Sequence, residues 1–259
     1  MLHVPNDALS RSLAYELTAK ERRKASRLIE ERVRARRPLA YLLKEAWLGE
    51  HRFYVDERVI VPRSFIAELL RDGLSPWIRR PMEVRRALDL CTGSGCLAIL
   101  LALAFPKATV DATDVSRAAL AVARRNVRAY RLGRRVRLAR ADLFSGAGPA
   151  RYDLIVANPP YVDAAAMRSL PPEYRHEPRL ALAGGRDGLR FVRRILQGAA
   201  GFLRPRGLLL VEIGHNRRSL ERAFPRLPFI WPETSAGYDC VFALGREDLP
   251  GRAALSALQ

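Results

Sequence analysis

Apolar and polar positions follow two alternating patterns from residue 86 onward. Short apolar runs, typical of buried strands, are separated by longer stretches in which apolar residues recur every three or four positions, as on a helix face. This alternation predicts an α/β fold with a mostly parallel sheet covered by helices on both faces. The predicted strands are residues 86–90, 108–113, 135–139, 152–157, 207–213, 227–231 and 239–244. The predicted helices are residues 95–105, 116–131 and 188–203 and a short segment after Asn216.

Residues 1–48 predict a small helical appendage. Thr18 and Glu21 have the spacing of a capping box, and apolar residues then recur at helical spacing until Pro38. The appendage has too few apolar residues to fold alone, so we expect it to pack on the part that follows.

A linking hairpin is expected over residues 49–63. The apolar runs 53–55 and 59–61 flank a polar turn, which predicts two short strands. Ser64 then begins the largest part, residues 64–259, as the cap of an amphipathic helix.

Polar side chains lie at the ends of four successive predicted strands: Asp89, Asp114, Asp142 and Asn158. Because the carboxyl ends of parallel strands meet at one edge of a sheet, these side chains are expected to share one crevice. Each alone is compatible with a helix cap or a solvated loop. The four together favour a binding site.

The turn after the first of these strands is a candidate cofactor loop. Gly93 and Gly95 allow a sharp turn and a close approach of a ligand to the backbone. Asp114 is the candidate ligand of ribose hydroxyls, with a helix N-cap as the alternative, and Asp142 could accept from an adenine amino group. The candidate cofactor-binding residues are Asp89, Cys91, Thr92, Gly93, Ser94, Gly95, Asp114, Asp142 and Asn158.

A rigid corner follows strand 152–157 and consists of Asn158, Pro159, Pro160 and Tyr161. Neither proline has an N–H, and each restricts the residue before it, so the strand stops there. The side-chain amide and the bare carbonyls of this corner lie at the carboxyl edge of the sheet and could face a substrate.

Other reactive side chains are expected to have structural roles. Cys91 and Cys96 are better explained as pocket walls than as nucleophiles. His176 and Glu177 are expected to hold a loop through ion pairs rather than to act as a general base. The four histidines are scattered and no Cys-x-x-Cys is present, so no metal site is expected.

The net charge of +18 comes from 45 Lys and Arg residues against 27 Asp and Glu residues. The charge has two explanations that fit equally well. It could attract nucleic acid through a long-range field, or it could reflect a genome that favours arginine codons. No apolar run approaches the ~20 residues of a membrane span. The N-terminal pattern is not that of a signal peptide and the three cysteines form no disulfide framework, so a cytoplasmic location is expected.

The sequence Asp-Leu-Cys-Thr-Gly-Ser-Gly-Cys at residues 89–96, followed by Asn-Pro-Pro-Tyr at 158–161, resembles class I S-adenosylmethionine-dependent methyltransferases. More narrowly, it resembles the protein-glutamine methyltransferases, which modify the side-chain amide nitrogen of a glutamine. The resemblance spans residues 18–244. It implies a Rossmann-like, seven-stranded sheet, S-adenosylmethionine as cofactor, and the cofactor-binding residues given above. It also implies a catalytic set of Asn158, Pro159, Pro160 and Tyr161. In that set Asn158 Oδ1 and the Pro159 carbonyl would orient the planar amide and stabilise the positive charge that grows on its nitrogen, and Tyr161 would pack against the amide.

The protein-glutamine methyltransferases are of two kinds. One modifies translation release factors, and the other modifies the third large-subunit ribosomal protein. Residues 40–64, 158–163 and 173–188 resemble the ribosomal-protein kind. The implied partner is a ribosomal protein or a ribosome-assembly intermediate, with electrostatic contact to ribosomal RNA. The N-terminal region is shorter than the helical domain of the family, and Phe65 replaces a usual proline. A release-factor methyltransferase, an amino-group methyltransferase of ribosomal RNA and a non-catalytic assembly factor stay as alternatives.

Overall fold

The computed structural model describes residues 16–145 and 151–249 of the chain. A six-stranded sheet forms its centre, in the order β5-β4-β3-β6-β7-β8, and only the β7–β8 pairing is antiparallel. The strands are β3 (Arg86–Leu90), β4 (Thr109–Asp114), β5 (Val136–Arg140), β6 (Tyr152–Ala157), β7 (Leu203–Glu212) and β8 (Val241–Gly245). Six of the seven predicted strands are thereby confirmed, as is the mostly parallel sheet.

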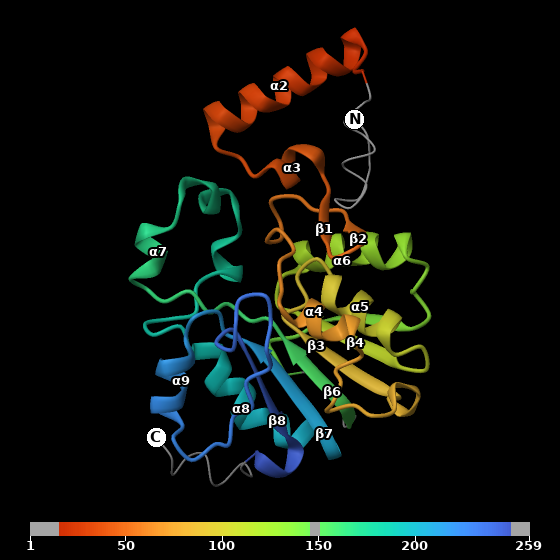
Figure 1. Ribbon diagram of the computed structural model, residues 1–259, viewed down its shortest axis with the longest axis vertical. Coiled ribbons are helices and arrows are strands. Elements are labelled where there is room, and N and C mark those ends of the chain that lie inside the picture. Colours follow the sequence, from red (N-terminus) through yellow and green to blue (C-terminus); the bar gives the residue numbers. More distant parts are fainter. Residues whose placement is uncertain (1–15, 146–150, 250–259) are drawn as a thin grey trace.

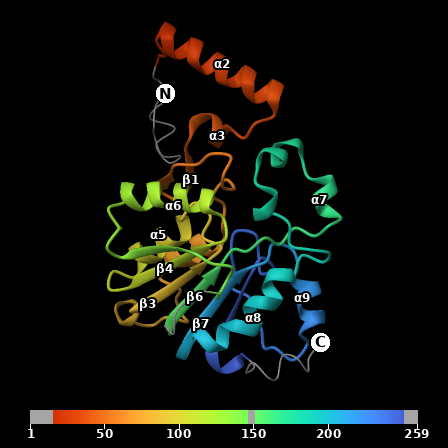
Figure 2. The same ribbon diagram turned by 180° about the vertical axis from the view of Figure 1, so that it is seen from behind.

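Helices cover both faces of this sheet (Figures 1 and 2). One face carries α4 (Ile66–Arg71), α5 (Cys96–Ala104) and α6 (Arg117–Ala129), and the other carries α8 (Arg190–Phe202) and α9 (Arg217–Ala223). Successive strand residues alternate between the two cores: Leu154 and Val156 pack with α4 and α5, whereas Ile155 and Ala157 pack with α8. Burial on both faces explains why the central strands are continuous apolar runs.

The predicted strand at 227–231 is wrong as a full strand. Within the described residues, only Ile230 of this segment pairs with the sheet, through an antiparallel bridge to Ala243. Pro228 and Pro232 flank the bridge and have no N–H, so a longer ladder cannot form. The described sheet therefore has six strands and one bridge where seven strands were expected.

The linking hairpin also differs from its prediction. The paired strands are β1 (Ala46–Leu48) and β2 (His51–Phe53), joined by a turn in which Gly49 has φ +59°, rather than the runs 53–55 and 59–61. The Tyr54 backbone is taken by a side chain: it donates to Asn126 Oδ1 at 2.8 Å and accepts from Asn126 Nδ2 at 3.0 Å. No ladder partner is left for the predicted strand. The division of the chain near residues 48 and 63 stays a prediction.

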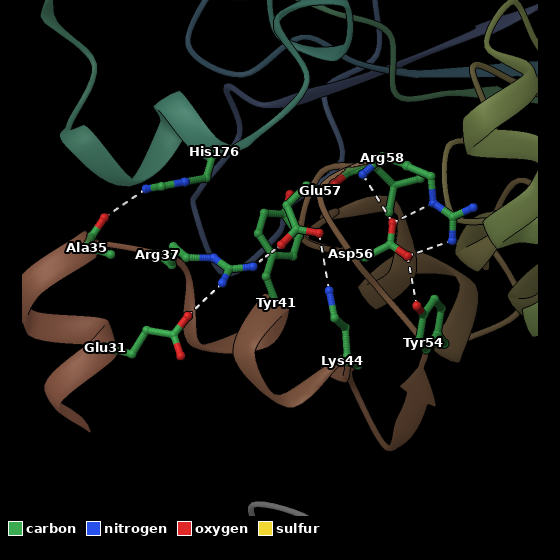
Figure 3. Close-up of polar contacts among 11 residues, drawn as sticks. Glu31, Ala35, Arg37, Tyr41, Lys44, Tyr54, Asp56, Glu57, Arg58 and His176 are labelled. Atoms are coloured by element: carbon green, nitrogen blue, oxygen red, sulfur yellow. Dashed lines mark hydrogen bonds and ion pairs between the residues drawn. The ribbon is translucent and has the colours of Figure 1, made fainter. Parts of the chain in front are cut away.

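The N-terminal helix α2 (Ala19–Ala35) begins with the predicted capping box, in which Thr18 and Glu21 bond each other's backbone. The helix has no buried residue, and its apolar Ile29 and Val33 are 63% and 69% exposed. The appendage packs on the part that follows through Tyr41 and Ala46, which are buried against Val55 and Val59, and not through α2. Polar contacts hold its C-terminal end instead: Arg37 pairs with both Glu31 and Glu57, as Figure 3 shows.

A second attachment of α2 comes from the segment that follows β6. This segment contains α7 (Ala166–Ser169) and the 3₁₀ helices η3 (Pro172–His176) and η4 (Arg179–Ala181), and it lies beside α2 in both views (Figures 1 and 2). Glu173 pairs with Arg32 and Arg36 at 2.9 and 2.8 Å, and His176 bonds the Ala35 carbonyl at 2.9 Å (Figure 3). Ion pairs thus tie this loop to the appendage.

Candidate active site

A cleft lies at the carboxyl edge of the sheet, where β3 and β6 are neighbours but their helices cover opposite faces. This switch point is where open α/β sheets bind ligands. The space in the cleft that protein atoms do not fill is about 990 Å³, and part of it is open to solvent. Eight of the candidate residues line it: Cys91, Thr92, Gly93, Ser94, Asp114, Asp142, Asn158 and Pro160. The others, Asp89, Gly95, Pro159 and Tyr161, lie outside the lining.

The turn after β3 has a backbone that few residue types adopt. Gly93 and Gly95 have φ values of +54° and +80°, and Cys91 between the strand and the glycines also has a positive φ, +59°. A Cβ on Gly93 would stand in open space, whereas one on Gly95 would lie 3.1 Å from the Ala123 Cβ of α6. The two glycines therefore differ: Gly93 keeps the cleft open and Gly95 lets α5 and α6 pack closely.

Asp89 lies fully buried beneath this turn. Its Oδ2 accepts a 2.5 Å hydrogen bond from the Thr92 hydroxyl, and its Oδ1 has no partner within the described chain. Burial raises the pKa of this carboxyl to about 7. A buried acceptor without a partner beside a glycine turn fits a cofactor that brings N–H or O–H donors. The residues present are thus compatible with S-adenosylmethionine.

Asp114 accepts hydrogen bonds from two backbone N–H groups at the edge of the cleft. Its Oδ1 accepts from the Ser116 backbone N–H at 2.8 Å, and its Oδ2 accepts from the Gly93 N–H at 2.9 Å. The N-cap of α6 itself is Ser116, whose hydroxyl accepts from Ala119. Each carboxylate oxygen keeps a second lone pair for a ribose hydroxyl. The ribose role stays a prediction.

Asp142 lines the cleft with its carboxylate already paired. Arg194 of α8 donates to both of its oxygens at 2.9 Å. The predicted hydrogen bond to an adenine amino group would share the carboxylate with this guanidinium, so the role assigned to Asp142 stays a prediction.

The corner after β6 presents the predicted acceptors. Asn158 Nδ2 donates to the Arg63 carbonyl at 3.4 Å, while its Oδ1 has no partner in the described part of the chain. The buried Pro159 carbonyl accepts no backbone hydrogen bond from the described residues. Two free acceptors thus stand at the corner, beside Pro160 in the cleft wall. Tyr161 points elsewhere: its hydroxyl donates to Glu212 at 3.4 Å.

Sequence reasoning missed the residues that support this corner. Arg63 and Ser64 line the cleft, and Glu212 ends β7 at the same sheet edge. The rule that found the four polar strand ends also applies to Glu212, which follows the apolar run Leu208-Leu209-Leu210-Val211. Glu177 pairs with Arg63 at 2.6 Å, which confirms its expected role in holding the loop.

The cleft has no reactive thiol. Cys91 and Cys96 both line it, as the sequence predicted. Burial raises the pKa of the Cys91 thiol far above its usual range and that of Cys96 to about 12. Both thiols therefore stay protonated at neutral pH and act as small wall residues.

The described residues contain no group of three His, Cys, Asp or Glu side chains able to hold a metal ion. None of their helices has the length and apolar character to cross a lipid bilayer.

Comparison with known proteins agrees with this geometry. The family model for the methyltransferase small domain matches residues 73–170. The ribosomal protein uL3 glutamine methyltransferase of Bordetella pertussis is 56% identical over 248 residues, which cover 96% of this chain and 83% of the relative. The protein of the same name from Bradyrhizobium diazoefficiens is 50% identical, with 96% and 80% covered. The chain belongs to this family. It is therefore an S-adenosylmethionine-dependent methyltransferase, as its motifs predicted.

Solved structures with low sequence identity share the fold. The catalytic domain of human METTL16, in complex with an RNA hairpin, matches with a TM-score of 0.56 at 17% identity and 74% coverage of both chains. The ribosomal protein L11 methylase of Lactobacillus delbrueckii matches with a TM-score of 0.50 at 20% identity, covering 73% of this chain and 82% of that one. These neighbours confirm the predicted class I methyltransferase fold.

Proposed function

We propose that this methyltransferase transfers a methyl group from S-adenosylmethionine to the side-chain amide nitrogen of a glutamine in ribosomal protein uL3. Membership of the uL3 glutamine methyltransferase family supports the substrate. The observation that carries the chemistry is the pair of free acceptors, Asn158 Oδ1 and the Pro159 carbonyl, at the end of the cleft. We assign the catalytic role to the corner Asn158, Pro159, Pro160 and Tyr161, in which Asn158 and Pro159 would bind the amide, Pro160 forms the cleft wall and Tyr161 anchors the corner through Glu212.

The acceptor nitrogen is the difficult partner in this reaction, because an amide shares its lone pair with its carbonyl. Asn158 donates its own N–H to Arg63, and this bond directs Oδ1 away from Arg63. Together with the Pro159 carbonyl, Oδ1 would accept both N–H groups of a glutamine amide and hold the nitrogen lone pair toward the cleft. Such acceptors also stabilise the charge that develops on nitrogen.

When bound, S-adenosylmethionine supplies an electrophilic methyl group on a sulfonium. We place it along Thr92, Gly93 and Ser94, with Asp114 holding the ribose and Asp142 beside the adenine. Asp89 lies beneath this loop and would hold it in place for the cofactor through the hydrogen bond from the Thr92 hydroxyl. Holding both reactants in line supplies most of the acceleration, since such displacements need little acid or base help.

The experiment that tests this function offers labelled S-adenosylmethionine to ribosomes and assembly intermediates from cells that lack uL3 methylation. Label in uL3, lost in Asn158→Ala, supports the proposal. Label in RNA would favour the alternative of an amino-group methyltransferase of ribosomal RNA. Label in a release factor offered in parallel would favour the release-factor kind, and no label at all would favour a non-catalytic assembly factor.

We also propose that α2 contacts ribosomal RNA of the particle that carries the acceptor. Five exposed cations recur along one face of the helix at spacings of three, four or seven residues. They are Lys20, Arg23, Lys24, Arg27 and Arg34. None of them forms an ion pair within the described part of the chain. At 1.5 Å per residue the stripe extends over roughly 20 Å, long enough to follow several phosphates.

Charge reversal tests the RNA contact. Arg23→Glu with Arg27→Glu should weaken binding to ribosomal RNA and flatten its salt dependence, because fewer counterions are released. The matched control reverses Arg124 and Arg128, two exposed arginines on α6. Equal losses in both double variants would mean that binding follows net charge and that α2 is no dedicated surface. A protein with such partners works where bacterial ribosomes assemble, so a cytoplasmic location is part of this proposal.

A further inference from the structure

Glu212 is a buried carboxylate that the mechanism above does not use. It ends β7, is 1% exposed, and forms no ion pair with any residue of the described chain. Hydrogen bonds satisfy it instead. Its Oε2 accepts from the Ser64 hydroxyl at 2.5 Å and from the Phe65 N–H at 3.0 Å, and its Oε1 accepts from the Tyr161 hydroxyl at 3.4 Å. A buried carboxylate held by donors alone is costly to keep, which calls for a functional reason.

The first partner of Glu212 is the segment opposite the corner. The Arg63 carbonyl accepts a hydrogen bond from the Asn158 side-chain amide, and the Arg63 guanidinium forms an ion pair with Glu177. Ser64 and Phe65, the next two residues, are bonded to Glu212. Residues 63–65 are thus held from three elements, and Glu212 supplies the contact from β7.

The second partner is the corner itself. Tyr161 is closely enclosed: a Cβ added at Gly184, Gly188 or Gly214 would come within 2.7, 2.5 or 2.7 Å of it. Asn216 Nδ2 donates to the Tyr161 carbonyl at 2.8 Å. The backbone and ring of Tyr161 therefore have little freedom to move. A shift of Glu212, which is bonded to the Tyr161 hydroxyl, would shift the rest of the corner as well.

We propose that Glu212 is a positioning residue that fixes the distance between the corner and residues 63–65, and so aims Asn158 at the acceptor amide. This inference rests on the proposed glutamine methylation. Glu212 does not line the cleft, so it acts through Ser64 and Tyr161 and not on the cofactor. Its loss should lower kcat and raise the acceptor KM while leaving the cofactor KM unchanged.

The charge of Glu212 matters because each of its partners is a donor. The ionised form accepts from all of them, whereas protonation replaces one acceptor by a donor. Burial raises the pKa of Glu212 to about 7, so this change falls within the range of an assay. Tyr161 and Cys240 are the titratable groups that interact with it, and the groove on its other side is lined by Glu50, His51, Glu68 and Arg71.

The test compares steady-state kinetics of the full chain from pH 6 to 9 with uL3 as acceptor. With saturating cofactor, which removes the effect of Asp89 titration on cofactor binding, Glu212→Gln should reduce kcat/KM for uL3 by about tenfold or more and remove the acid limb of its pH profile. The cofactor KM should stay within about twofold of wild type. The control is Glu68→Gln, a carboxylate of the same groove that bonds Ser235 and not the corner. It should behave as wild type.

A double-mutant cycle tests the route through Tyr161. Glu212→Gln combined with Tyr161→Phe should be no worse than the more damaging single variant, because both break one linkage. Losses that multiply, or a Glu212→Gln enzyme with an unchanged acid limb, would overturn the inference.

Two further readouts keep the outcomes separate. If Glu212→Gln does not fold, Glu212→Asp serves as the second variant, because it keeps the charge on a shorter side chain. Glu212→Asp should lower kcat and keep the acid limb of the pH profile. A wild-type kcat in this variant would count against the positioning role. Wild-type protein that fails to methylate uL3 would refute the proposed function, whereas active wild type with an equally active Glu212→Gln variant would refute only the role of Glu212.

Discussion

Two alanine substitutions in the turn after β3 should have opposite effects on folding and binding. Gly95→Ala should destabilise the fold and leave cofactor affinity almost unchanged. Gly93→Ala should be milder for the fold and should weaken cofactor binding. The difference follows from what each new methyl group would meet. At Gly95 it would lie 3.1 Å from the Ala123 Cβ, whereas at Gly93 its nearest neighbour would be the Cys91 carbonyl oxygen at 4.0 Å.

The magnitudes follow from the backbone and the packing. Both glycines have positive φ values, +54° for Gly93 and +80° for Gly95, so alanine costs about 1–2 kcal/mol at either position. Overpacking against α6 adds about 1–3 kcal/mol at Gly95 alone. Gly95→Ala should therefore cost about 2–5 kcal/mol, or roughly 4–20 °C in Tm for a chain of this size. A methyl group in the cofactor cleft should cost Gly93→Ala about tenfold in affinity.

Thermal unfolding and calorimetric titration with S-adenosylhomocysteine, the demethylated cofactor, measure both effects on the same samples. Gly133→Ala is the matched control, since its added Cβ would meet nothing within 4 Å and its φ is not positive. Equal losses of affinity in Gly93→Ala and Gly95→Ala would refute the division of roles. So would a Gly93→Ala protein that binds as wild type.

Three further substitutions test the site and its support. Asn158→Ala should lower kcat by about 10²–10³-fold with little change in cofactor KM, measured with uL3 as acceptor; a wild-type rate would exclude its role. Asp114→Ala should raise the cofactor KM much more than it lowers kcat, and an unchanged KM would count against the ribose contact. Asp56→Asn should cost about 1–2 kcal/mol in urea unfolding, because Asp56 is 6% exposed and accepts from Arg58 and Tyr54 (Figure 3). These contacts lower the pKa of Asp56, so the stabilisation is present above its unfolded pKa of about 3.9 and is lost as pH falls toward the folded value. The difference from wild type should be constant above about pH 5 and shrink below about pH 4, whereas a difference that grows on acidification would contradict it.

The sheet was predictable because its strands are buried on both faces. Continuous apolar runs such as Leu154-Ile155-Val156 have few alternatives to a central strand, and the polar residue after each run marks the shared edge. The cleft followed from the same rule, which placed Asp114, Asp142 and Asn158 in one lining. Local pattern and global fold agree here.

The misses occur where contacts distant in sequence decide the structure. Asn126 of α6 takes the backbone bonds of Tyr54, and nothing near residue 54 indicates this. Glu173 lies far from Arg32 in the chain, so the polar attachment of α2 could not be inferred from the pattern of the helix. The hydrogen bond that Ser64 donates to Glu212 likewise joins residues 148 positions apart.

The central claim is that the corner at Asn158 presents a glutamine amide of uL3 for methylation. Tandem mass spectrometry of uL3, isolated without methylation and incubated with the protein and S-adenosylmethionine, tests it most directly. We predict one added methyl group on the side-chain amide of a glutamine, absent when Asn158→Ala replaces the wild type. A methyl group on another residue type of uL3, or uL3 left unmodified while RNA or a release factor gains the methyl group, would contradict the account.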